Sequence, residues 1–127
     1  MKNIPWEKLA QAAWEVRENS YIIGSTKVGA AIYTVNQKII RGCNIEHRYR
    51  SHDIHAEVNA IGNMVASGEE RFQAIIIVAE RDFFTPCGSC MDWIMQHGIE
   101  NCLVAFENRK GERQIFTSSE LMPYYPK

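Results

Sequence analysis

Two short segments carry side chains that could hold a metal ion and move a proton. They are His-Ala-Glu at residues 55–57 and Pro-Cys-Gly-Ser-Cys at residues 86–90. Two thiolates and one imidazole are good zinc ligands, and three protein ligands leave the fourth position of the ion open for water. A carboxylate beside such a water is suited to proton transfer, because zinc lowers the pKa of bound water from 15.7 to about 7. The segments predict one zinc ion per chain, with ligands His55, Cys87 and Cys90 and with Glu57 as the catalytic acid and base.

The spacing of the cysteines favours metal binding over the alternatives. Cys87 and Cys90, at i and i+3, share one face of the first turn of a predicted helix. The positive end of a helix favours the thiolate, which is the form that binds metal. A lone Cys-x-x-Cys could instead be a redox pair or a coincidence, and a structural zinc site should have a fourth Cys or His nearby. Cys43 and Cys102 fall inside predicted strands, where apolar packing explains them.

The segments around these residues alternate between helical and extended patterns. Helices are predicted over residues 5–18, about 54–67 with Asp53 as N-cap, and about 87–97 ended by Gly98, with a last helical turn capped by Ser118 or Ser119. Strands are predicted over residues 28–35, 38–43, 73–80, 102–106 and 113–116. The run at 75–78 is apolar without alternation, which predicts a central strand covered on both faces.

The order of these elements, α-β-β-α-β-α-β-β, predicts an α/β fold with one mixed sheet and helices on both faces. Residues 1–127 are expected to form a single domain, since no linker or repeat interrupts them. Only about five residues, 107–111, separate the last two strands. A parallel crossover needs a dozen residues or more, so these strands must form an antiparallel hairpin.

Charge and hydropathy exclude several classes of partner. Fourteen Lys and Arg against fifteen Asp and Glu give a formal charge of −1, without the basic excess of a domain that binds nucleic acid or an anionic membrane. The longest apolar run is too short to span a bilayer, and the N-terminal residues lack the apolar stretch of a secretory signal. The sequence therefore predicts a cytoplasmic protein that binds neither nucleic acid nor membrane.

His-x-Glu followed about thirty residues later by Pro-Cys-x-x-Cys resembles the signature of the zinc-dependent deaminases of nucleosides and nucleobases. Three further segments resemble cytidine deaminases in the same order: Val-Gly-Ala-Ala at 28–31, Asn-Ile-Glu at 44–46 and Glu-Leu-Met-Pro-Tyr-Tyr at 120–125. The final hairpin matches the branch that contains cytidine and blasticidin-S deaminases. The resemblance implies a three-layer α/β/α fold with a five-stranded mixed sheet. It also implies hydrolytic deamination of cytidine or deoxycytidine in pyrimidine salvage.

The resemblance also implies roles for individual residues. Glu57 takes the proton of the attacking water, protonates N3 of the pyrimidine and delivers a proton to the departing ammonia. The backbone around Ala56 and Pro86 contacts the base, and Asn44 and Glu46 hold the ribose hydroxyls. The family implies a homo-oligomer, commonly a tetramer, whose pockets are completed by neighbouring chains.

Departures from the family pattern leave the substrate open. Thr26 replaces a Phe that shapes the pocket in cytidine deaminases, and Met91-Asp92 replaces the usual Arg-Gln. Blasticidin S or another modified cytosine is the alternative substrate. The basic segment 47–50 is interpreted as a solvated loop or subunit contact, or as a site for a substrate carboxylate or phosphate. A catalytically inactive, zinc-stabilised binding module is the alternative from another class, but it would not need Glu57.

Overall fold

The computed structural model describes residues 3–126, and its elements follow the predicted order. The helices are α1 (Trp6–Arg17), α2 (Ala56–Ala66), α3 (Gly88–His97) and α4 (Ser118–Leu121), with a 3-10 turn at Arg50–His52. The strands are β1 (Gly29–Thr34), β2 (Ile39–Cys43), β3 (Phe72–Val78), β4 (Gly98–Glu107) and β5 (Arg113–Thr117). None of the helices in the described residues is long and apolar enough to cross a membrane.

The five strands form one mixed sheet in the order β2-β1-β3-β4-β5. Only β3 and β4 run parallel, because α3 lies between them in the chain and supplies the crossover. The remaining neighbours pair antiparallel, including β4 with β5 from Leu103↔Thr117 to Glu107↔Arg113. The predicted final hairpin is therefore confirmed.

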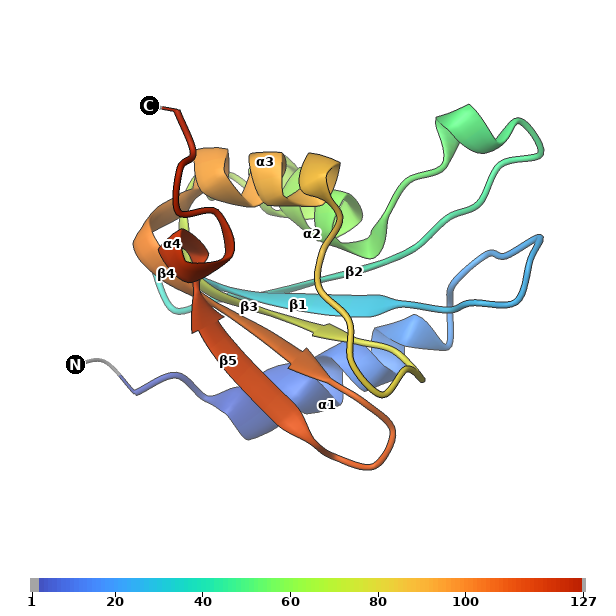
Figure 1. The fold of residues 1–127 in the computed structure, drawn as a ribbon, viewed down its shortest axis with the longest axis horizontal. Helices are drawn as coiled ribbons and strands as arrows, with labels where there is room; N and C mark the ends of the chain where they lie inside the picture. The colour runs from blue at the N-terminus through green and yellow to red at the C-terminus, as the bar shows by residue number, and fades with distance from the viewer. Residues whose placement is uncertain (1–2, 127) are drawn as a thin grey trace.

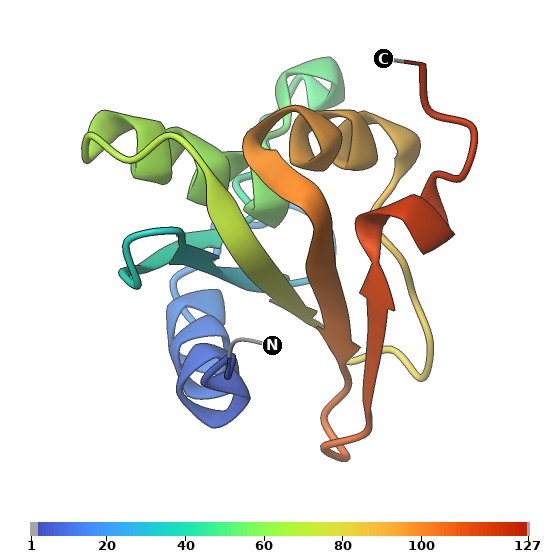
Figure 2. The ribbon, with the colours of Figure 1, turned by 90° about the vertical axis from the view of Figure 1, so that its left-hand side faces the viewer.

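Strand β3 lies at the centre of three layers (Figures 1 and 2). All seven of its residues are buried, as its apolar run predicts. Ile75 and Ile77 pack into one cluster with α2 and α3, whereas Ile76 and Val78 pack into the other cluster with α1. Helix α1 thus covers one face of the sheet and α2 and α3 cover the opposite face, which confirms the three-layer α/β/α architecture (Figure 1).

Two predicted helix caps are wrong. Asp53 does not cap α2, because it accepts hydrogen bonds from the backbone N–H of His47 (2.7 Å) and from Arg50 (2.9 Å) within the preceding loop. His55 occupies the N-cap position instead. At the C-terminal end, the cap is Thr117, one residue before the serines that were expected. Its hydroxyl accepts from the N–H of Glu120 (3.1 Å), whose carboxylate accepts from the N–H of Thr117 (2.8 Å).

Helix α2 is fixed tightly to the edge strand β2. A Cβ built on Gly42 would lie 2.3 Å from the backbone N of Ala60, so only glycine permits this close approach. Asn59 accepts a hydrogen bond from the N–H of Cys43 (3.0 Å), and Asn63 donates one to the carbonyl of Arg41 (2.8 Å). The strand therefore sets the position of the helix that carries the predicted catalytic residues.

Candidate active site

The three predicted metal ligands meet where two helices begin. His55 is the N-cap residue of α2, Cys87 is the N-cap residue of α3, and Cys90 lies in the first turn of α3. The Nδ1 atom of His55 lies 3.2 Å from the Sγ of Cys90 and 3.5 Å from the Sγ of Cys87. All three ligand atoms lie within 4.8 Å of one another. Cys43 and Cys102 lie on β2 and β4, as predicted.

These distances fit a zinc ion. With Zn–S near 2.3 Å and Zn–N near 2.05 Å, nitrogen and sulfur on a tetrahedral ion lie about 3.6 Å apart. Burial raises the pKa of the Cys90 thiol, and the negative charge of Glu57 raises it further. A divalent cation offsets both effects, because metal binding deprotonates the thiols that coordinate it. Two thiols and an imidazole gathered in this way have the donor chemistry of a zinc site.

Glu57 lies beside these ligands in the first turn of α2, and its side chain is buried. Burial raises the pKa of its carboxyl group, while its own backbone N–H and the nearby His55 act in the opposite direction. A raised pKa makes a carboxyl group hold a proton more readily than a free one, which suits a group that accepts and returns protons. Glu57 thus places a buried carboxyl group, which can accept and return a proton, beside the three candidate ligands.

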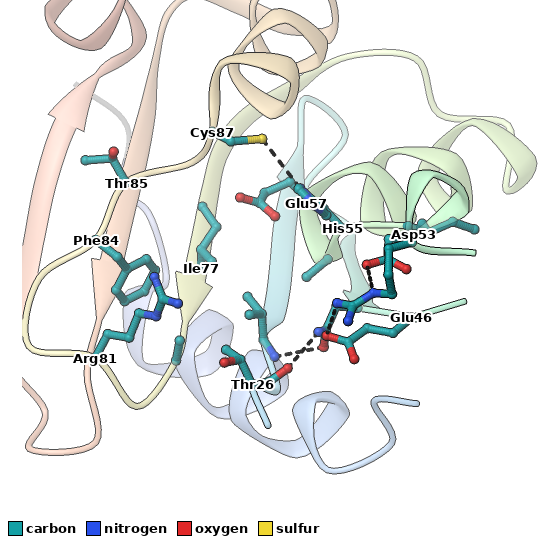
Figure 3. A pocket seen from close by; sticks show the side chains of 16 residues that line it. Thr26, Glu46, Asp53, His55, Glu57, Ile77, Arg81, Phe84, Thr85 and Cys87 are labelled. Carbon is teal, nitrogen blue, oxygen red and sulfur yellow. Dashed lines mark hydrogen bonds and ion pairs between the residues drawn. The ribbon is translucent and has the colours of Figure 1, made fainter. Parts of the chain in front are cut away.

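An open cavity of about 250 Å³ leads away from this site (Figure 3). His55, Glu57 and Cys87 form one end of it, and the side chain of Ile77 at the end of β3 forms part of its floor. One wall carries Glu46 and Asp53 and the opposite wall carries Arg81, Phe84 and Thr85 (Figure 3). The volume suits a small planar ring together with part of a substituent.

The structure brings three of the four predicted substrate-binding residues to this cavity. Asn44, Glu46 and Ala56 line it, and so does Thr26. Pro86 is buried and is not among the described residues that line the cavity, although its neighbours on both sides are.

Asn44 and Glu46 also fasten the segment that precedes β1. Asn44 accepts from the N–H of Val28 and donates to the carbonyl of Thr26, both at 2.9 Å. Oε1 of Glu46 accepts from the N–H groups of Ile23 (2.6 Å) and Gly24 (2.8 Å). These two backbone hydrogen bonds hold the pKa of the Glu46 carboxyl below its ordinary value, with Gly24 contributing most. Glu46 is therefore a fixed anion in the wall of the cavity.

The charge of Arg50, the last residue of the basic segment 47–50, is paired within the protein. Arg50 lines the cavity, but it pairs with Glu46 at 3.1 Å and with Asp53 at 2.9 Å. Its single positive charge thus offsets one of the two negative charges of Glu46 and Asp53, and this wall keeps a negative balance.

The loop after β3 contributes residues that the sequence pattern did not identify. Arg81, Phe84 and Thr85 all lie in the cavity wall. Their position directly after the buried strand could have identified them from the sequence. Loops at the carboxyl end of a buried strand commonly form binding sites in α/β sheets.

Comparisons with known proteins agree with this geometry. The family model described as "Cytidine and deoxycytidylate deaminase zinc-binding region" matches residues 5–106. A cytidine deaminase of Sporosarcina psychrophila is 33% identical over 119 residues, covering 92% of this chain and 88% of the relative. A blasticidin-S deaminase of Bacillus cereus is 30% identical over 125 residues, covering 91% and 88%. The crystal structure of a cytidine deaminase from Burkholderia pseudomallei superposes with a TM-score of 0.92 at 29% identity, covering 97% of this chain and all of the other.

Proposed function

The chain belongs to the cytidine and deoxycytidylate deaminase family, and from this we propose how its residues carry out the hydrolytic deamination of a cytosine nucleoside. It is a zinc-dependent aminohydrolase of the cytidine deaminase type. One observation supports the assignment of residues. The ligand atoms of His55, Cys87 and Cys90 lie within 4.8 Å of one another at the end of a cavity that Glu57 also lines.

His55, Cys87 and Cys90 hold the zinc ion in this proposal. When bound, zinc supplies the activation of a water molecule, lowering its pKa to about 7. Glu57 accepts the proton of the attacking water on its carboxylate and transfers a proton to N3 of the pyrimidine. It then delivers a proton to the amino group that leaves as ammonia. Its burial and its place beside the ligands support this role.

Ala56 and the backbone on either side of Pro86 contact the base, and Asn44 and Glu46 bind the sugar hydroxyls. Asn44 and Glu46 each use part of their hydrogen-bonding capacity on the 23–28 segment. A carboxylate has about four acceptor sites, and an amide has two N–H groups and two lone pairs. Both side chains thus retain capacity for a ribose hydroxyl while their orientation is fixed.

Cytidine and deoxycytidine are the proposed substrates. Relatives named cytidine deaminase match most of the chain, and the anion at Glu46 suits a sugar that donates hydrogen bonds. Blasticidin S and a binding module without catalysis are not favoured. A module without catalysis has no use for the buried carboxylate of Glu57 beside the metal ligands.

We also propose that the chain forms a homo-oligomer, a tetramer in the first instance. Apolar side chains are exposed on the two segments beside the cavity. Tyr21 is 65% and Tyr49 is 61% accessible, Ile23 is exposed next to Glu46, and the exposed Ile54 lines the cavity. Single apolar residues are normal on a surface, but a group of this kind favours an interface. Free thiolate ligands fit the reducing cytoplasm as the location of the protein. Uridine as the product fits a role in pyrimidine salvage. Sedimentation velocity measures the oligomeric state.

The experiment that tests the proposed function measures ammonia release from cytidine, deoxycytidine, cytosine and blasticidin S. Zinc content is determined on the same preparation by elemental analysis. We expect about one zinc per chain and fastest turnover of the two nucleosides. Cys87→Ala should lose zinc and activity together, whereas Cys43→Ala should keep both. A preparation that carries zinc and turns over blasticidin S but neither nucleoside would overturn the substrate assignment.

A further inference from the structure

Arg81 is a charged side chain in the cavity wall, and the proposed deamination assigns no role to it. It is exposed and follows β3 by three residues. Within residues 3–126 its guanidinium makes no side-chain hydrogen bond and no ion pair, although other arginines in this part of the molecule do. Figure 3 shows it on the wall opposite Glu46 and Asp53.

The acidic residues near Arg81 are already paired with other cations. Glu80 accepts from Arg17 at 2.8 Å and from Arg109 at 3.0 Å. Asp82 lies 3.8 Å from Lys110. Arg81 thus has adjacent acids on both sides in the sequence, yet neither of them is among the residues that line the cavity. The wall that carries Arg81 therefore presents a net positive charge to the cavity.

The opposite wall is different, because its one guanidinium is already paired with two carboxylates. Arg50 pairs with both Glu46 and Asp53, so this arginine is not available to an anionic ligand. Of the two arginines that line the cavity, Arg81 is therefore the one without an ion pair among residues 3–126, and it lies across the cavity from Glu46 and Asp53.

When C4 of cytosine lies at the metal site, the group attached to N1 of the ring comes near Arg81. In the proposed function, C4 of cytosine lies beside Glu57 and the metal ligands, at the inner end of the cavity. N1 is para to C4 in the six-membered ring, so the group attached to N1 points away from that end. In that orientation the substituent passes between two walls, and Figure 3 shows Thr26 and Glu46 on one of them and Arg81 and Phe84 on the other.

We infer that Arg81 binds an anionic group on the sugar of the substrate, so that the enzyme prefers a cytosine nucleoside bearing a phosphate or carboxylate. This inference rests on the proposed function and specifies its substrate class. A guanidinium presents paired N–H groups that match both anions and binds them with charge-assisted hydrogen bonds. Cytidine itself remains a substrate, because the base and the sugar hydroxyls have their own contacts.

Two anionic substrates show whether the group that Arg81 binds is a phosphate or a carboxylate. Cytidine, cytidine 5′-monophosphate and cytidine 5′-carboxylic acid are compared as substrates of the wild type, Arg81→Ala, Arg81→Lys and Lys38→Ala. Lys38 is an exposed cation in the β1–β2 turn and serves as the control for net charge. Faster kcat/KM for the phosphate identifies a nucleotide, and faster kcat/KM for the carboxylate identifies an acidic sugar.

We expect Arg81→Ala to lower kcat/KM for the preferred anionic substrate by about 10-fold, as the loss of one charge-assisted hydrogen bond implies. Its kcat/KM for cytidine should stay within about two-fold of the wild type, and Arg81→Lys should recover part of the loss. Added salt should reduce the preference of the wild type for the anionic substrate over cytidine. Arg81 is exposed, so dissolved ions screen its charge. Lys38→Ala should behave as the wild type does.

Binding measurements test the role of Arg81 independently of whether the protein deaminates cytidine. Calorimetry on Glu57→Gln, with and without Arg81→Ala, gives the affinities for the same three ligands without turnover. If the wild type deaminates no cytosine nucleoside, the proposed function fails, whereas the affinities still decide on Arg81. Equal affinity for the neutral and both anionic ligands, no binding of either anion, or an equal loss on all three in Arg81→Ala would overturn the inference.

Discussion

At the level of single residues, Glu57 combines burial with access to the cavity. Glu57→Gln is nearly isosteric but cannot carry the proton that the reaction moves. We expect zinc content and melting temperature to be unchanged and kcat to fall by about 10⁴-fold or more, since general acid and base catalysis alone contributes ~10²–10⁴-fold and this group serves several transfers. Steady-state ammonia release together with elemental analysis measures this. A variant that kept more than a tenth of the rate would indicate another base.

Glu46 tests the contact with the sugar. Glu46→Gln keeps an oxygen that accepts from the N–H groups of Ile23 and Gly24, but it removes the charge. We expect kcat/KM for cytidine to fall about 10- to 150-fold, the effect of losing a charge-assisted hydrogen bond, while cytosine without its sugar changes little. The same kinetic assay on both substrates measures the difference. Equal losses on both, with a lower melting temperature, would assign Glu46 to loop stability alone.

At the level of elements, the contact between β2 and α2 controls the geometry of the site. Gly42→Ala would place a Cβ 2.3 Å from the backbone N of Ala60 and 2.8 Å from the carbonyl of Ala56, so the helix must move. We expect the free energy of unfolding to fall by about 1–3 kcal/mol, as for other overpacked sites, and kcat to fall because α2 carries Glu57. Urea unfolding and ammonia release measure the two effects.

The matched control lies on the same helix. A Cβ on Gly62 meets nothing within 4 Å. Gly62→Ala should therefore stabilise the protein by about 0.5–1 kcal/mol and leave activity unchanged, because alanine favours the helix. Full activity in Gly42→Ala would show that the close approach does not govern the site.

At the level of the whole molecule, Glu80 joins distant segments through its pairs with Arg17 on α1 and Arg109 in the β4–β5 turn. The hydrogen bond and charge of Arg109, and then the charge of Arg17, hold the pKa of the Glu80 carboxyl below its ordinary value. A carboxyl group with a lowered pKa stabilises the fold above its unfolded pKa, about 4.3, and this contribution is lost as pH falls through the lower folded value.

Glu80→Gln should therefore be less stable than the wild type at pH 7, and the difference should narrow as the pH falls below the unfolded pKa of about 4.3. Urea unfolding at pH 7, 5, 4 and 3 measures this difference. Glu100→Gln, at an exposed glutamate that forms no ion pair among residues 3–126, should match the wild type throughout. A gap between Glu80→Gln and wild type that did not narrow between pH 5 and pH 3 would point to packing, because the contribution of an ionised carboxyl declines below its unfolded pKa.

Much of the fold and the metal site could be predicted from short stretches of sequence. The apolar run 75–78 identified the buried central strand, because a strand covered on both faces shows no alternation. The length of the 107–111 turn required an antiparallel hairpin, because a parallel crossover needs more chain. His55, Cys87 and Cys90 could be grouped as ligands because few side chain types bind zinc and helix starts orient them together.

Tertiary structure alone decided how charges are paired and which loops face the cavity. Asp53 has the residue type of a helix cap, yet its partners are His47 and Arg50 in the folded loop. Arg50 and Arg81 are equivalent in sequence terms, but only the fold shows that the first pairs with Glu46 and Asp53 and that the second lines the cavity without an ion pair among residues 3–126. Local pattern records the propensity of each segment, whereas the partner of a charged side chain depends on segments that the chain brings together only when the sheet is assembled.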